Sequence, residues 1–113
     1  MASKEPNPAD REIFLKKAPV WNRLSMAKLV AEYLPYLNEG EEIPEPFRER
    51  SRVMHEDKWK FEHPETITRE DMVDRLEAYL LDGIIGIHAL DPFSPELREE
   101  VTEFLEEVHR GRN

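Results

Sequence analysis

The chain has 113 residues, 39% of them hydrophobic, and a formal net charge of −9, which predicts one domain with a single modest core. It contains no cysteine, which excludes disulfide bonds, thiolate nucleophiles and Cys-ligated metal sites. The first residues lack the apolar core of a signal peptide, and no apolar run approaches the roughly 18 residues that span a bilayer. We therefore expect a cytoplasmic protein that does not bind membranes.

The N-terminal segment is polar before any helical pattern starts. Residues 1–9 include two prolines and are predicted to be a disordered tail, ahead of one helical domain at residues 10–110. In this domain "DREIFLKKA" has apolar residues at helical spacing. Pro19 is expected to interrupt the short helix that this spacing predicts.

A second helix is predicted beyond this proline. Asn22 is its candidate N-cap, and apolar residues then recur at i, i+3, i+4, i+7 and i+8. Pro35 removes a backbone donor and clashes with the preceding turn, so we expect a kink or an end near Leu34. Pro46 then suits the first position of a third helix, of two to three turns, that runs toward residues 55–63.

The C-terminal half has the clearest helix boundaries. Thr68 is a predicted N-cap with Asp71 three residues further on, and Gly83 follows the last turn of that helix. The last helix is predicted to have Ser94 as its N-cap and Pro95 at its first position. Its apolar stripe has a helical period and comprises Leu97, Val101, Phe104, Leu105 and Val108.

Residues 84–93, "IIGIHALDPF", have no helical spacing. A strand here would have no partner and would leave backbone groups unpaired, so we expect a buried connector or a short helix. The predicted fold class is therefore all-α: a single compact bundle of four to five helices with a short irregular connector at residues 84–93.

Most catalytic and cofactor-binding motifs are missing from the sequence. The chain has four glycines in total, and neither a P-loop nor a G-x-G-x-x-G motif occurs. The serines fall in the predicted tail, at a helix start, on a polar helix face and at a cap, so none is predicted to be an activated nucleophile. We predict no catalytic residue, no cofactor and no metal, and a protein that is not an enzyme.

Residues 55–63, "HEDKWKFEH", are the strongest exception to this prediction. On a continuous helix, the two histidines of this stretch lie about 12 Å apart along the axis, which is too far to share one ion. If the chain reversed between them, a set of metal ligands would converge, comprising His55, Glu56, Glu62 and His63.

The favoured interpretation of this stretch is an ordinary segment of the bundle. Trp59 and Phe61 alternate with charged residues, and we expect both to point inward and close one end of the core. His88, which stands beside isoleucine and alanine, is expected to be a core histidine hydrogen-bonded to the backbone.

The last helix is rich in glutamate opposite its apolar stripe, over about 15 Å of its length. Residues 68–108 hold three arginines against twelve carboxylates, so direct nucleic-acid binding is not expected there. The simplest explanation is a solvated polar face, which can also dock a basic partner. The candidate partner-binding surface comprises Glu96, Glu99, Glu100, Glu103, Glu106 and Glu107.

Three functions from different classes remain open. The favoured one is a small, non-catalytic interaction module, such as a regulator, adaptor or accessory subunit, that binds a protein partner through a helical face. The second is an acidic mimic of nucleic acid that inhibits a DNA-binding protein, because spaced carboxylates resemble phosphates. The third is a metal-dependent or acid–base enzyme that uses His55, His63 and nearby carboxylates. The sequence alone identifies neither the partner nor an oligomeric state.

Overall fold

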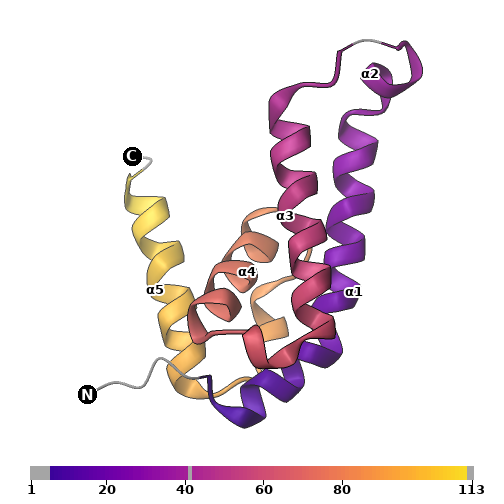
Figure 1. The fold of residues 1–113 in the computed structure, drawn as a ribbon. Coiled ribbons are helices and arrows are strands. Elements are labelled where there is room, and N and C mark those ends of the chain that lie inside the picture. The colour runs from indigo at the N-terminus through magenta and orange to yellow at the C-terminus, as the bar shows by residue number, and fades with distance from the viewer. Residues whose placement is uncertain (1–5, 41, 112–113) are drawn as a thin grey trace.

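The computed structural model describes residues 6–40 and 42–111, which form five α-helices and two short 3₁₀ helices and contain no strand (Figure 1). The predicted all-α fold with four to five helices is confirmed. Residues 1–5 of the predicted tail lie outside the described residues. In chain order the elements are α1 (Pro8–Glu32), α2 (Leu34–Asn38), α3 (Glu45–Glu62), η1 (Pro64–Thr66), α4 (Arg69–Leu81), η2 (Ile87–Leu90) and α5 (Pro95–Gly111).

Helix α1 continues through Pro19, so the predicted interruption there and the predicted N-cap at Asn22 are wrong. A proline inside a helix costs about 3 kcal/mol, but α1 makes long-range contacts on both sides of it. Phe14 and Ala18 are fully buried, and the Asn22 side chain donates a hydrogen bond to the carbonyl of Met54 on α3 at 3.2 Å. These contacts favour one continuous helix over the local preference for a break.

The predicted break near Leu34 is confirmed. Tyr33 forms the C-cap of α1, and α2 begins at Leu34 with Pro35 in its first turn. Helix α3 is longer than the two to three turns predicted, because its 18 residues pack beside α1 and bury Met54 and Asp57. It therefore runs through the stretch in which a chain reversal was considered.

The core lies where α1, α4 and α5 meet, with α3 beside α1 and α5 packed on α4 (Figure 1). Two edge-on or tilted aromatic pairs join α1 to its neighbours: Phe14 with Phe61 at 6.0 Å and Trp21 with Tyr79 at 5.9 Å between ring centroids. The buried cluster comprises Phe14, Ala18, Ile67, Met72, Val73, Leu76, Tyr79, Leu90, Phe93, Leu97 and Val101. No helix in the described ranges is both long and apolar enough to cross a lipid bilayer.

Helix α4 has the boundaries that its sequence predicts. The Thr68 hydroxyl accepts a hydrogen bond from the Asp71 amide at 3.0 Å, and the Asp71 carboxylate accepts one from the Thr68 amide at 3.0 Å. This reciprocal capping box satisfies two amides that have no partner within the helix. At the other end Gly83 has φ +73°, a left-handed conformation that favours glycine.

The start of α5 is tied to the start of α1 by a buried carboxylate. One oxygen of Asp10 accepts a hydrogen bond from the Ser94 amide at 2.7 Å, and the other accepts from the Ser94 hydroxyl at 2.6 Å. The Ser94 hydroxyl in turn accepts from the Leu97 amide at 3.4 Å, as predicted for an N-cap. Asp10 is only 3% exposed, so this contact joins the first turn of α1 to the start of α5 in the interior of the protein.

The connector at residues 84–93 is irregular apart from η2, as predicted. It is only partly buried, because Leu90 and Phe93 enter the core whereas Ile87 lies outside it. His88 is also on the outer side, with 93% of its side chain exposed and Nδ1 3.5 Å from Asp91. The prediction of a core histidine was wrong because the short 3₁₀ turn directs Leu90 inward and leaves His88 in solvent.

Candidate interaction surface

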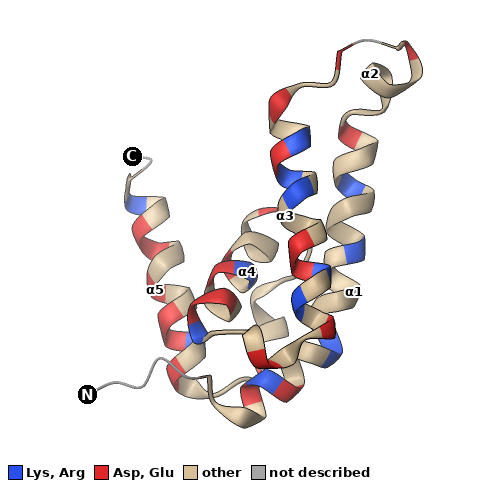
Figure 2. Cartoon of the chain, viewed as in Figure 1, with Lys and Arg blue, Asp and Glu red and all other residues tan. Residues whose placement is uncertain are grey.

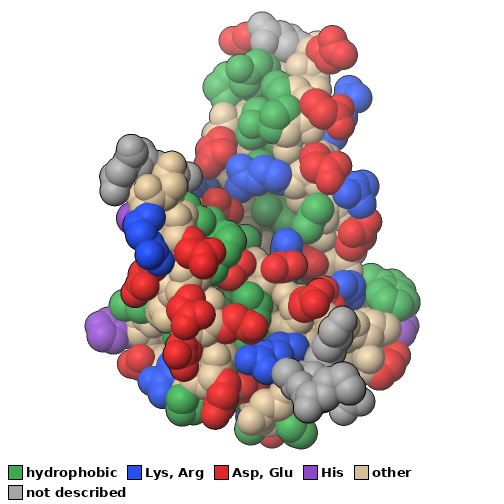
Figure 3. Space-filling model, turned by 90° about the vertical axis from the view of Figure 1, so that its left-hand side faces the viewer, with side chains coloured by type: hydrophobic (Ala, Val, Ile, Leu, Met, Phe, Trp, Pro, Cys, Tyr) green, Lys and Arg blue, Asp and Glu red, His purple; other side chains and the backbone are tan. Residues whose placement is uncertain are grey.

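The six predicted glutamates are all exposed on α5, which carries carboxylates along most of its length (Figure 2). Figure 3 views the molecule from the side on which α5 lies and shows acidic side chains along this helix as well as over the rest of the visible face. Within the described residues only Glu100 among the six forms an ion pair, with its Oε2 3.3 Å from Nε of Arg69. The other five carboxylates of this surface, the α5 acidic face, are therefore available to a partner.

The apolar stripe of α5 is buried mainly in its first half. Leu97 and Val101 are 2% and 0% exposed. By contrast Phe104, Leu105 and Val108 are only partly buried. The helix is thus anchored near its N-terminus, whereas its second half leaves apolar surface beside the glutamates.

An apolar groove of about 390 Å³ runs between the end of α4, the connector and the second half of α5. Two of its side chains are unusually open for their size, since Leu81 and Ile87 are each 47% exposed. A neighbouring hollow continues along α5 and is lined in part by Glu106 and Arg110. One glutamate of the α5 acidic face therefore lines this second hollow. The groove, called here the α4–α5 groove, is lined by Leu80, Leu81, Ile85, Gly86, Ile87, Leu105, Val108 and His109.

Glu77 on α4 is a buried carboxylate that the sequence analysis missed. It is 8% exposed, and burial is the main reason that its pKa is raised from 4.5 to about 7, with further contributions from the charges of Asp74 and Glu100. Its spacing offers a signal, because Glu77 stands four residues after Val73 and three before Leu80, which is the spacing of residues that share one helix face.

The histidines of residues 55–63 do not converge, because α3 is continuous from His55 to Glu62 and His63 follows as its C-cap. His55 Nδ1 lies 2.7 Å from the carbonyl of Ser51, and His63 Nδ1 lies 2.9 Å from the carbonyl of Trp59. Each imidazole ring therefore contacts the backbone carbonyl four residues before it and does not approach the other histidine. No group of three or more His, Asp or Glu side chains within residues 6–40 and 42–111 is arranged to hold a metal ion.

The two aromatic residues of this stretch have different environments. Phe61 packs on the core beside Phe14, in line with the prediction. Trp59 is 52% exposed and stacks on the His63 ring, with 4.0 Å between centroids and 14° between planes. The predicted inward position of Trp59 is wrong because residues two apart on a helix point to different faces, whereas alternation suits a strand.

Comparison of the chain with protein-family models, curated proteins and solved structures finds no match.

Proposed function

We propose that the protein is a non-catalytic interaction module that binds a protein partner through the α5 acidic face and the α4–α5 groove. The observation that supports this most directly is the exposure of Leu81 and Ile87 on the α4–α5 groove, next to a hollow that Glu106 lines. Apolar side chains that are open together at a concave site beside charged residues are characteristic of binding surfaces. The fitting partner has an apolar strip flanked by Lys or Arg.

The two parts of this surface have different physical roles. Burial of the apolar groove provides most of the affinity, since fully desolvated contacts dominate interface energies. The glutamates lie at the rim, where charge complementarity accelerates association and is screened by salt. Glutamates four residues apart on α5 also repel each other by a few tenths of a kcal/mol per pair, and a basic partner relieves that repulsion.

The test begins with capture of a partner on the immobilised protein and its identification by mass spectrometry. The dissociation constant is then measured for the parent and for two multiple variants that change net charge equally. We expect the α5 variant to bind about tenfold more weakly at low salt, and the control to bind like the parent. The α5 variant combines E99Q, E103Q, E106Q and E107Q, and the control combines the exposed positions E39Q, E42Q, E62Q and E65Q.

The groove is tested separately by Ile87→Ser, with Leu24→Ser on α1 as the control, since Leu24 is 50% exposed and does not line the groove. Weakened binding in the Ile87 variant alone supports the proposal. Equal binding by both multiple variants and by both serine variants would refute it. Release of the partner by competing duplex DNA would instead identify the acidic face as a mimic of nucleic acid.

A further inference from the structure

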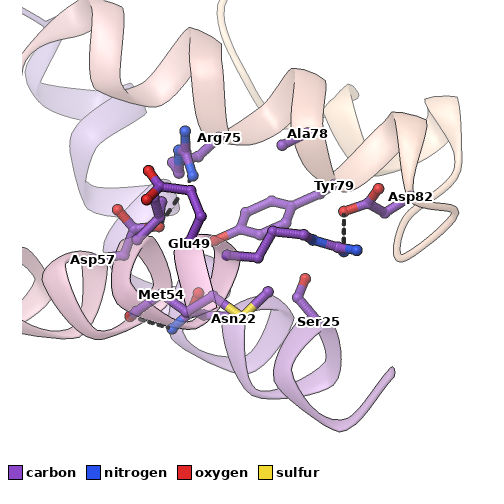
Figure 4. A pocket seen from close by; sticks show the side chains of 11 residues that line it. Asn22, Ser25, Glu49, Met54, Asp57, Arg75, Ala78, Tyr79 and Asp82 are labelled. Carbon is purple, nitrogen blue, oxygen red and sulfur yellow. Dashed lines mark hydrogen bonds and ion pairs between the residues drawn. The ribbon is translucent and has the colours of Figure 1, made fainter. Parts of the chain in front are cut away.

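A pocket of about 220 Å³ lies where α1, α3 and α4 meet, and it is independent of the α5 acidic face and the α4–α5 groove. Figure 4 shows the Tyr79 ring lying across it from α4, with Ser25 entering from α1. Its lining combines charged side chains with the hydroxyl-bearing residues Ser25 and Tyr79 and the apolar residues Val53, Met54 and Ala78.

The charged groups of this pocket already have partners within the protein. Nη1 of Arg75 lies 3.4 Å from Oδ2 of Asp57, and Nη2 of Arg50 lies 3.3 Å from Oδ2 of Asp82. Glu49 is paired with Arg52, whose hydrogen bond lowers the pKa of the Glu49 carboxyl. A charged ligand would have to compete with these ion pairs.

Two residues that line the pocket have a hydroxyl group without a hydrogen-bond partner in the described part of the chain, namely Ser25 Oγ and Tyr79 Oη. Both residues are only 4% exposed. A buried polar group without a partner is costly and normally bonds to protein, water or ligand. Burial also raises the pKa of the Tyr79 hydroxyl, so this group stays protonated and can donate a hydrogen bond.

The environment of the pocket disfavours further charge. Burial raises the pKa of Asp57 even though Arg75 and Lys60 lie near enough to lower it. The lining also includes the apolar side chains of Val53, Met54 and Ala78, together with the Tyr79 ring. The pocket thus combines an apolar wall with hydrogen-bonding hydroxyls on two helices.

We propose that this pocket binds a small uncharged aromatic molecule that carries a hydroxyl or amide group able to bond with Ser25 and Tyr79. A cavity of about 150 Å³ accepts benzene, so 220 Å³ accommodates a single ring with one small substituent. The ring packs on the apolar wall, and the polar substituent satisfies the two hydroxyls.

The experiment uses single-ring probes that differ in one substituent, titrated into the full chain and followed by protein NMR. Benzamide and phenol carry a polar uncharged group, toluene carries none, and benzoate carries a charge. We expect benzamide or phenol to bind with a Kd of about 1 mM, which is typical of so few atoms. Resonances of Ser25, Met54 and Tyr79 should shift, and toluene and benzoate should bind at least about fivefold more weakly.

Two variants that preserve shape keep the test specific. Ser25→Ala and Tyr79→Phe each remove one hydroxyl and should weaken benzamide or phenol binding about fivefold or more, with toluene unaffected. The controls are Ser51→Ala and Tyr36→Phe, since neither residue lines the pocket. Unchanged affinity in both pocket variants, equal binding of toluene, or the lack of any shift at saturating probe would each overturn the proposal.

Discussion

Replacing Glu77 with glutamine should stabilise the protein in a manner that depends on pH. The pKa of Glu77 is raised from 4.5 to about 7, chiefly by burial, so the folded chain keeps a proton that the unfolded chain releases as pH rises between these values. The parent therefore loses folding free energy over this range, and by pH 8 the loss reaches about 3 kcal/mol. Below about pH 4.5 both states are protonated and the loss disappears.

Glutamine keeps the shape of the protonated side chain and carries no charge, so the Glu77→Gln variant avoids this loss. Urea denaturation followed by circular dichroism measures the free energy of unfolding. We expect the variant to exceed the parent by about 1.4 kcal/mol at pH 5.5 and by about 3 kcal/mol at pH 8. Glu103→Gln is the control, because Glu103 is exposed on α5. A gain that is the same at both pH values, or no gain, would refute the reasoning.

Two further predictions concern stability. Asp10→Ala removes both hydrogen bonds to Ser94 and should lower the free energy of unfolding, measured by urea denaturation, by about 3 kcal/mol. The control Asp91→Ala, at an exposed position, should change this free energy little. Equal losses in the two variants would contradict the structural role of Asp10. Pro19→Ala restores a backbone amide that can donate a hydrogen bond to the Leu15 carbonyl in α1. The variant should have a higher melting temperature, because proline inside a helix costs about 3 kcal/mol. A lower melting temperature would show that packing of the Pro19 ring contributes more to stability than the restored hydrogen bond.

The boundaries of α4 and α5 were predictable because several local signals coincide in each. Thr68 is the N-cap that its sequence predicts and forms a capping box with Asp71, and Ser94 accepts the hydrogen bond expected of an N-cap. Such bonds involve residues three apart in sequence, so their geometry follows from the local pattern. The exposure of the six glutamates on α5 was also predictable from the local pattern, because each lies opposite a well-defined apolar stripe.

The continuity of α1 and the length of α3 were not predictable from local patterns. Asparagine is a residue type that favours the N-cap position. The side-chain amide of Asn22 instead donates a hydrogen bond to the carbonyl of Met54, 32 residues away in sequence. The pocket between α1, α3 and α4 depends on the same long-range packing. Ser25 and Tyr79 approach it from helices that the sequence does not place relative to each other, so no motif indicated the site.

The division of α5 into an anchored half and an open half makes the proposed interaction testable. Its N-terminal half is held by the Asp10–Ser94 contact and by burial of Leu97 and Val101. Four substitutions from Glu99 to Glu107 on the exposed face therefore remove charge without removing those contacts, and they also relieve repulsion between neighbouring glutamates. The α5 variant should consequently be at least as stable as the parent. A loss of partner binding in that variant then reports on the surface itself, because unfolding would lower its stability as well.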